Sequence, residues 1–104
     1  MSESTQQSDE TLDLRLVKNE TESRYEAWVG DELAGIVQYR DFADHVSFPH
    51  TEVEPEFEGM GIASQLARYA LDDVVDQGKL IVPLCPYMKV YVKRHPEYRD
   101  HVRP

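Results

Sequence analysis

Cysteine is nearly absent from this sequence of 104 residues, which contains only Cys85. A lone cysteine cannot form a disulfide within the chain, which fits a reducing compartment. No apolar run approaches the roughly 20 residues that a membrane-spanning helix needs. The first eleven residues are polar and acidic and lack the apolar core of a signal peptide. These absences predict a soluble, cytoplasmic protein without a membrane partner.

Basic residues are also scarce, with 11 Lys and Arg against 20 Asp and Glu and a net charge of −9. Because nucleic-acid binding relies on Lys and Arg to neutralise phosphates, this balance argues against a general nucleic-acid binder. The charge is unevenly spread, since residues 79–104 contain six basic and two acidic residues and carry +4. This basic end can receive an anionic small molecule, contact another subunit, or be an ordinary solvated helix face.

The chain is long enough for one compact domain, and 40% of its residues are hydrophobic. Residues 1–11 show no periodicity and predict a flexible acidic tail, which leaves 12–104 as the domain. Alternating apolar residues predict four strands in an antiparallel meander. The strands are expected at residues 12–17, 25–29, 33–39 and 45–53. Pro49 lies in the fourth and predicts a bulge or an edge position, because proline cannot donate to the ladder.

The second half of the chain has helical spacing. Apolar residues from Ile62 to Val75 predict an amphipathic helix, and Gly78 follows it as a natural C-terminal cap. Residues 79–84 predict a short buried strand. Pro86 suits the first turn of a second helix, which stops or kinks at His95 because the following proline disfavours helical geometry there. The order β-β-β-β-α-β-α predicts an α+β or mixed α/β domain.

A glycine pair, Gly59 and Gly61, precedes the first predicted helix. Glycines let the backbone turn sharply and approach a ligand closely, and the helix start offers unpaired N–H groups with partial positive charge. Together these features predict a phosphate or pyrophosphate site, although such a pair can also be only a tight connection. Ile62 rules out a P-loop, which needs Gly-Lys-[Ser/Thr], and Ser64 stands where a Rossmann fingerprint needs Gly or Ala.

The glycine loop resembles the acyl-coenzyme A loop of the GNAT superfamily of N-acetyltransferases, [Gln/Arg]-x-x-Gly-x-[Gly/Ala]. A small single-domain GNAT subgroup with a Cys-Pro motif after the fifth strand is similar over most of residues 32–102. That similarity is carried by three blocks in the same order and spacing. They are His50–Val53, Pro83–Tyr87, and Tyr91 with Arg94–Tyr98.

This resemblance implies a minimal GNAT fold with a mixed, mostly antiparallel sheet, splayed between its fourth and fifth strands, and acetyl-CoA as cofactor. The pantetheine arm would bind in the splay along the fourth strand. Its expected contacts are Thr51, Glu52, Val53 and Glu54. The pyrophosphate would bind backbone amides of the loop. Those residues are Glu58, Gly59, Met60, Gly61, Ile62 and Ala63. The two helices that usually follow the first strand are missing, so the amine acceptor site should be open, including to a protein-borne amine.

The loop departs from the family pattern in its charge. Glu56 occupies the Gln or Arg position, and Glu58 lies where a basic residue is common. Two carboxylates near a pyrophosphate lower the affinity for coenzyme A by repulsion, mostly at low salt. Lys89, Lys93 or Arg94 are candidates to compensate.

Acetyl transfer to an amine needs a base for the ammonium and an acid for the departing thiolate. Glu52 is a candidate base, and His50 lies on the same face of the strand and is a second one. Either can instead be structural, as a solvated carboxylate or a hydrogen-bonded imidazole. No spacing of His, Cys, Asp or Glu matches a metal site, so no metal is expected.

Tyr91 and Cys85 are predicted beside the thioester. Tyr91 matches the tyrosine that protonates the coenzyme A sulfur in many GNAT enzymes, and it can equally be a core aromatic. Cys85 precedes Pro86 at a helix start, where the helix dipole favours a thiolate. It is expected to contact the sulfur or to carry acetyl transiently, although a lone cysteine is more often a small buried hydrophobe.

The sequence therefore predicts an acetyl-CoA-dependent N-acetyltransferase that moves acetyl directly to an amine. The alternative is a GNAT-like module that binds coenzyme A or a partner protein without catalysis. A scaffold with an acidic surface is a third interpretation, supported by charge alone. The acceptor and the oligomeric state are not specified by the sequence.

Overall fold

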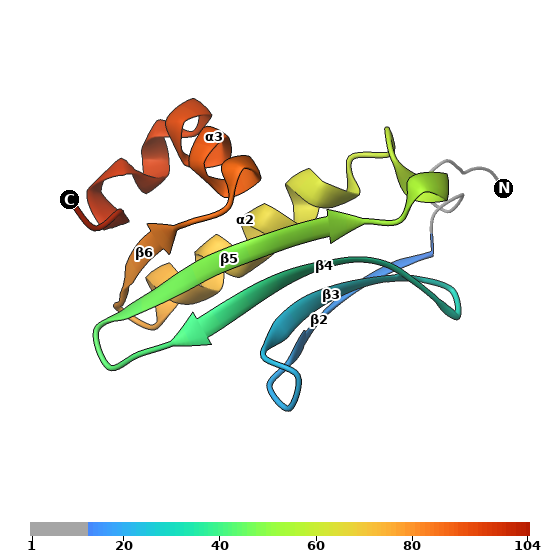
Figure 1. Ribbon diagram of the computed structural model, residues 1–104, viewed down its shortest axis with the longest axis horizontal. Helices are drawn as coiled ribbons and strands as arrows, with labels where there is room; N and C mark the ends of the chain where they lie inside the picture. The colour runs from blue at the N-terminus through green and yellow to red at the C-terminus, as the bar shows by residue number, and fades with distance from the viewer. Residues whose placement is uncertain (1–12) are drawn as a thin grey trace, which may run out of the picture.

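The computed structural model describes residues 13–104, and the predicted tail at 1–11 lies outside them. The described elements follow the predicted order (Figure 1). The strands are β2 (Leu14–Asn19), β3 (Arg24–Val29), β4 (Glu32–Asp41), β5 (His45–Val53) and β6 (Leu80–Pro83). The helices are α2 (Ile62–Asp76) and α3 (Pro86–Arg94), with the 3-10 segments η1 (Pro55–Phe57) and η2 (Pro96–His101).

The strands form one sheet in the order β2-β3-β4-β5-β6. Neighbours from β2 to β5 are antiparallel, and β6 runs parallel to β5. A parallel pair needs a crossover connection, and α2 supplies it. Between β2 and β3 the described chain forms only a turn, closed by a hydrogen bond from the Ser23 amide to the Glu20 carbonyl oxygen. The predicted mixed, mostly antiparallel sheet is confirmed, and so is the absence of helices between the first two described strands.

Pro49 creates the predicted bulge in β5. The register with β4 runs from Gln38 opposite His50 to Arg40 opposite Ser47, so two residues of β5 face one of β4. Because successive side chains of a strand alternate between faces, one extra residue reverses which side chains point inward. Phe48 is fully buried before the bulge, whereas His50 is exposed after it. The bulge therefore determines how the end of β5 presents its side chains.

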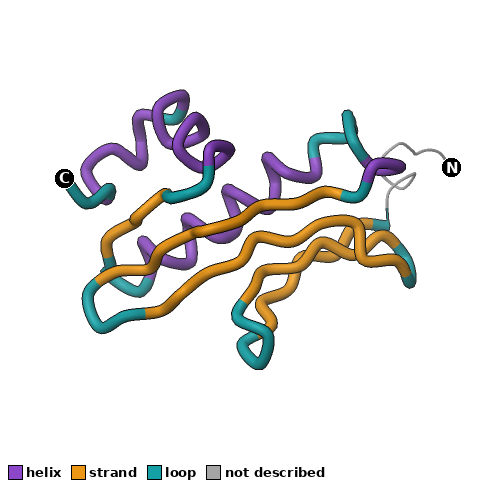
Figure 2. Tube along the Cα trace, viewed as in Figure 1, coloured by secondary structure: helices purple, strands orange, loops and turns teal. Residues whose placement is uncertain are grey.

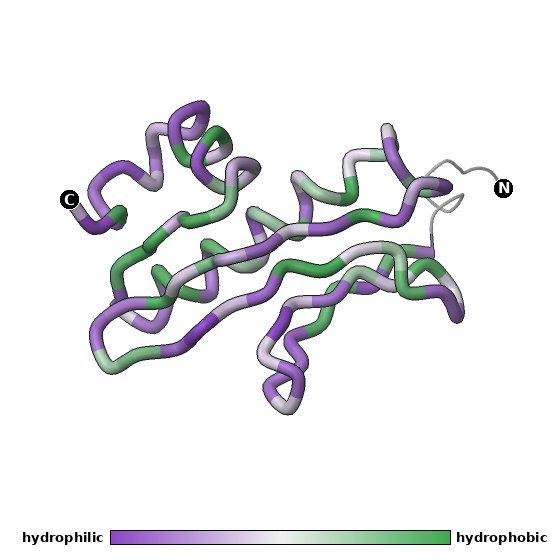
Figure 3. The backbone as a smooth tube through the Cα atoms, viewed as in Figure 1, coloured by the Kyte–Doolittle hydropathy of each residue, from purple (hydrophilic) through white to green (hydrophobic). Residues whose placement is uncertain are grey.

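The main core lies between the sheet and α2, which packs behind the sheet in the view of Figure 1. Hydrophobic and hydrophilic segments alternate along this helix (Figure 3), as its sequence periodicity predicts. Its buried residues are Ile62, Leu66, Ala67, Ala70, Leu71 and Val74. Burial of each larger aliphatic side chain contributes about 1.5–3 kcal/mol. Gly78 follows the helix with a φ of 74°. At the start of the helix, Ile62 is part of the core against which Val53 of β5 packs.

No helix of residues 13–104 covers the opposite face of the sheet (Figure 2). Glu26 lies on this face and is only 4% exposed. Its carboxylate accepts three hydrogen bonds. The donors are Asn19 Nδ2, Arg24 Nε and Trp28 Nε1. Burial alone would raise the pKa of Glu26, but these hydrogen bonds outweigh it and lower the pKa. The side chain of Arg24 is thereby held by Glu26.

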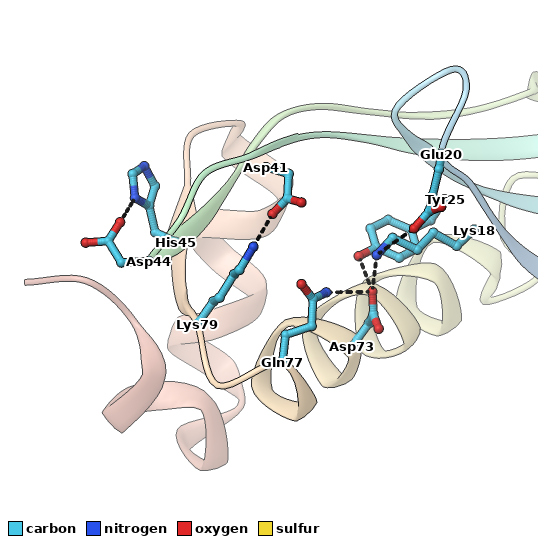
Figure 4. A network of polar contacts seen from close by, with 9 residues as sticks. All are labelled: Lys18, Glu20, Tyr25, Asp41, Asp44, His45, Asp73, Gln77 and Lys79. Carbon is cyan, nitrogen blue, oxygen red and sulfur yellow. Dashed lines mark hydrogen bonds and ion pairs between the residues drawn. The ribbon is translucent and has the colours of Figure 1, made fainter.

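A second polar network joins β2 and β3 to α2 (Figure 4). One oxygen of Asp73 accepts hydrogen bonds from Lys18 Nζ at 2.9 Å, Tyr25 Oη at 2.8 Å and Gln77 Nε2 at 3.1 Å. Burial raises the pKa of Asp73, but the bonds from Lys18 and Tyr25 outweigh it, so the pKa is lowered. A lowered carboxyl pKa stabilises the fold above the unfolded value of about 3.9, and this stabilisation is lost as pH falls through the folded pKa.

We expect Asp73→Asn to lower the free energy of unfolding at pH 7 by about 1 kcal/mol, because the ion pair with Lys18 is lost. The difference from the wild type should shrink as the pH is lowered through the folded pKa of Asp73, where the native carboxyl becomes protonated. Urea unfolding across this range measures it. Asp41→Asn is the matched control, because Asp41 pairs with Lys79 at an exposed position and should change stability less. A pH-independent deficit in Asp73→Asn would contradict the linkage.

Candidate functional site

β5 and β6 separate where β6 ends. Their pairing runs from His45 opposite Leu80 to Phe48 opposite Pro83, and β5 then continues to Val53 without a neighbour on that side among the described residues. The amides of Leu84 and Cys85 both donate to the Phe48 carbonyl oxygen, at 3.1 and 3.0 Å. The chain then turns away into α3. The sheet is therefore splayed open beside the second half of β5.

The backbone groups of Thr51 and Val53 face this open edge. In an antiparallel pair, alternate residues of a strand bond to the same neighbour. The Glu54 amide donates to the Ala34 carbonyl oxygen next to β4 at 2.8 Å, so Glu52 and Glu54 bond toward β4. Of the four residues expected to contact a pantetheine arm, Thr51 and Val53 thus have backbone groups available, whereas the amide of Glu54 is already used.

The glycine loop leads from η1 to the start of α2. Gly59 and Gly61 have φ angles of 83° and 78°, which favour glycine. Gly61 is the N-cap of α2 and provides no capping side chain. The amide of Gln65 makes the first helical bond, to the Gly61 carbonyl oxygen, which leaves the amides of residues 62–64 without helical partners. The loop thus ends in unpaired donors at the positive end of a helix.

A cavity of about 300 Å³ opens at this helix start. Its lining combines residues of η1, the loop and the start of α2 with one residue each of β5 and α3. The residues are Val53, Phe57, Glu58, Gly59, Gly61, Ile62, Ala63, Ser64 and Tyr87. Most of the predicted loop residues are therefore in the cavity wall, while Met60 is 46% exposed and does not line it. A cavity with unpaired amides and no capping side chain fits a pyrophosphate.

Three lining residues were not predicted from the sequence: Phe57, Ser64 and Tyr87. Tyr87 lies four residues before Tyr91, so helical spacing would have placed both on one face of α3. Burial raises the pKa of Tyr87. The structure thus adds a wall from α3 to the loop site.

Cys85 lies beside the open edge of β5. It is the N-cap of α3 and is 6% exposed, and its Sγ is 3.3 Å from Thr51 Oγ1. The splay therefore brings together two of the predicted residues that are 34 positions apart in the chain. A thiol here adjoins the backbone groups that face the edge.

His50 and Glu52 form a pair on the uncovered face of the sheet. His50 Nε2 is 3.1 Å from Glu52 Oε1, and about half of each side chain is exposed. The two side chains lie on the same face of β5, as the sequence predicted. This is the face of the sheet opposite α2. Glu52 and Glu54 also line a cavity of about 220 Å³ there, with Arg24 and apolar Leu33 and Ile36. The pair is accessible to a ligand that approaches from this face.

Tyr91 lies on α3, with its ring centroid 6.1 Å from that of Tyr87. It is 5% exposed, its ring stacks on His95 at a centroid distance of 3.8 Å, and its hydroxyl is buried without a hydrogen-bond partner among residues 13–104. The ring is therefore a core aromatic, as one of the two interpretations of the sequence had it. Its role toward sulfur stays a prediction.

Within residues 13–104 no three His, Cys, Asp or Glu side chains are grouped as a metal site would need. In the same part of the chain, no helix has the length and apolar character to cross a membrane.

A mixed sheet that splays beside a glycine loop at a helix start is the framework of the GNAT acetyltransferases. The family model of the GCN5-related N-acetyl-transferases matches residues 24–101, well over half of the chain. The chain therefore belongs to this family.

The curated relatives are called Protein NATD1. The Gallus gallus protein is 41% identical over 61 residues, which are 57% of this chain and 56% of that protein. The Homo sapiens protein is 39% identical over 61 residues, or 57% of this chain and 54% of that protein. The chain thus spans about half the length of the curated relatives it matches.

Solved structures share the fold at low identity. A GCN5-like protein from Staphylococcus aureus superposes with a TM-score of 0.67 at 21% identity, covering 86% of this chain and 88% of that one. A ribosomal-protein-alanine N-acetyltransferase from Brucella melitensis gives a TM-score of 0.56 at 20% identity, over 78% of this chain and 61% of that one. At such identities the likeness concerns the fold alone, and it agrees with the predicted GNAT architecture.

Proposed function

We propose that this protein binds acetyl-CoA and transfers the acetyl group to an amine. The observation that carries the proposal is the cavity at the start of α2, where unpaired amides adjoin the open edge of β5. The amides of residues 62–64 would hold the pyrophosphate, and the backbone of Thr51 and Val53 would hold the pantetheine arm. The cofactor supplies an activated acetyl thioester, and the residues around it supply binding and proton transfer.

The proton transfers are assigned by position. Glu52 would accept a proton from the ammonium, directly or through water, because an ammonium cannot act as a nucleophile. His50, at 3.1 Å from Glu52, would share that proton. Cys85 and Tyr91 lie on the α3 side, where the resemblance predicts the proton donor for the departing sulfur. The uncovered face of the sheet leaves room for a protein-borne or polyamine amine.

Thiol release tests this function. Purified protein is incubated with acetyl-CoA and a panel of amines, and free thiol is measured against hydrolysis without amine. We expect amine-dependent release that falls at least tenfold in Glu52→Gln. Coenzyme A binding without release by any amine would favour the non-catalytic module, for which the acidic loop is the supporting observation. Absence of coenzyme A binding would contradict the acetyltransferase and leave only a module that binds a partner protein.

The acidic loop provides a further prediction. Glu56 and Glu58 are both exposed, but only Glu58 lines the cavity. Glu58→Arg replaces repulsion of the phosphates by attraction, so we expect coenzyme A to bind about fivefold more tightly at low ionic strength. Glu56→Arg makes the same change of charge outside the cavity and should have a smaller effect. Calorimetric titration at two salt concentrations measures both, and equal effects would show that only net charge matters.

A further inference from the structure

The cavity of about 220 Å³ on the uncovered face of the sheet combines one cation with two carboxylates. Its lining residues come from β3, β4 and the end of β5. They are Arg24, Leu33, Gly35, Ile36, Glu52 and Glu54. Val53 lines the loop cavity, whereas its neighbours Glu52 and Glu54 line this one, so the end of β5 separates the two cavities. Because β5 has an open edge here, a small molecule on this face can reach a thioester in the splay.

Arg24 reaches this cavity with the distal end of its side chain. Arg24 is opposite Gln38, which does not line the cavity. Ile36 and Glu52, which are opposite each other in the next row on this face, do line it. Arg24 Nε donates to Glu26 Oε2 at 2.7 Å, and Glu26 is opposite Ile36, so the side chain extends along β3 toward that row. The guanidinium end of Arg24 is therefore the part that lines the cavity.

This guanidinium is fixed but not fully used. Glu26 is 4% exposed and also accepts hydrogen bonds from Asn19 Nδ2 at 2.9 Å and Trp28 Nε1 at 3.0 Å, so its carboxylate is immobile and holds Arg24 Nε. Within residues 13–104 the two terminal amino groups of Arg24 have no hydrogen-bond partner. A guanidinium that is already oriented and still has free donors is well suited to bind a carboxylate.

The other polar groups of the cavity suit a cation. Glu52 pairs only with His50 in the described part of the chain, and Glu54 forms no ion pair there. Two carboxylates without a Lys or Arg partner attract an ammonium group. The apolar side chains of Leu33 and Ile36 complete the lining and suit a short methylene chain. The cavity thus has complementary groups for both ends of a small zwitterion.

We propose, on the basis of the proposed acetyltransferase function, that the acceptor is a small amine that also carries a carboxylate, such as an amino acid. Arg24 binds the carboxylate, Glu52 and Glu54 bind the ammonium, and Glu52 then takes its proton. The amine nitrogen forms a bond to the acetyl carbon as the thioester C–S bond breaks, and the leaving thiolate receives a proton. A polyamine or the lysine side chain of a protein lacks the carboxylate and would be recognised less well.

Matched pairs of amines test the proposal. The members of each pair have the same carbon chain and amine and differ in the carboxylate: 4-aminobutanoate with butylamine, and lysine with cadaverine. Calorimetric titration uses the full chain saturated with coenzyme A, which has no acetyl group to transfer and therefore reports acceptor binding alone. We expect the carboxylate-bearing amine to bind at least tenfold more tightly in at least one pair. The KM values for thiol release from acetyl-CoA should follow the same order.

Arg24→Gln should reduce this ratio of affinities to about twofold or less. Arg15→Gln is the matched control, because Arg15 lies 5.9 Å from the Trp28 ring on the same face and does not line the cavity, so the ratio should stay the same. Arg24→Gln also removes a partner from the buried Glu26. If that variant does not fold, Arg24→Gln/Glu26→Gln removes both members of the ion pair and should lose the ratio equally. Thermal midpoints verify folding.

Equal affinities within both pairs would overturn the inference, and so would an unchanged ratio in the folded Arg24 variant. Acetyl transfer to butylamine or cadaverine as efficient as transfer to the carboxylate-bearing partner would overturn it while leaving the proposed function intact. Absence of thiol release with every amine has a different meaning, because it would remove the proposed acetyltransferase together with this inference.

Discussion

Gly61→Val should weaken coenzyme A binding by at least tenfold, or about 1.4 kcal/mol. A Cβ at Gly61 would meet no protein atom within 4 Å, so the added carbons would stand in the cavity where a pyrophosphate approaches the amides. The φ of 78° also strains any L-residue, which would disturb the geometry of the helix start. Calorimetric titration of both forms measures the effect.

Gly78→Val is a matched control for this strain. Gly78 has a φ of 74° and open space around its Cβ position, like Gly61, but it follows the opposite end of α2. The 15 residues of the helix separate the two positions by roughly 22 Å. We expect similar losses of thermal stability in both variants and weakened coenzyme A binding only in Gly61→Val. Equal affinities of Gly61→Val and the wild type would remove the pyrophosphate assignment.

Cys85→Ala should abolish a covalent adduct that the native protein forms with coenzyme A disulfide. The Cys85 thiolate attacks one sulfur of that disulfide, a mixed disulfide forms, and one coenzyme A thiol leaves. The reaction is expected because Sγ contacts Thr51 at the open edge where the pantetheine arm is proposed to bind. Intact-protein mass should increase by one coenzyme A moiety, and dithiothreitol should remove it.

Binding of the coenzyme A moiety at the loop should make this reaction faster than the reaction of Cys85 with other disulfides. Cys85 is only 6% exposed, so glutathione disulfide should react much more slowly than coenzyme A disulfide. Gly61→Val should slow the reaction with coenzyme A disulfide alone. Reversible coenzyme A binding should persist in Cys85→Ala, since the loop amides supply most of the affinity. A native thiol that never forms the adduct and resists alkylation until the protein unfolds would be a core residue only.

The acetyl-transfer rate of Cys85→Ala then assigns its role. A loss of several hundredfold, about 3.5 kcal/mol, would indicate a direct part in the chemistry. A change of a few-fold would make Cys85 a neighbour of the thioester and leave the proton transfers to the other candidates.

Elements of the fold with local causes could be predicted from the sequence. The spacing of apolar residues indicated α2, Pro86 indicated the start of α3, and Pro49 indicated a bulge. Each of these features depends on residues that are near one another in the sequence. The glycine loop was predictable for the same reason, since Gly59 and Gly61 adopt positive φ angles that favour glycine. These signals, with the family resemblance, identified the framework and the loop.

The relative position of the candidate residues depended on the tertiary structure. His50 and Glu52 were expected to share a face, but the bulge at Pro49 decided that this face is opposite α2. Tyr87 was missed because its place in the loop cavity depends on where α3 packs rather than on its own neighbours in sequence.

By itself, then, the sequence determined the order of the elements and the loop, because hydrophobic periodicity and glycine geometry act over a few residues. It indicated the family through the resemblance of its motif blocks. The tertiary structure alone decided that Cys85 contacts Thr51. It also decided that Arg94 rather than Lys93 lines a cavity that shares Ser64 and Tyr87 with the loop cavity. These contacts depend on the parallel pairing that ends at Phe48 and Pro83 and on the direction in which α3 leaves it. Such pairings join residues more than thirty positions apart, and no local pattern specifies them.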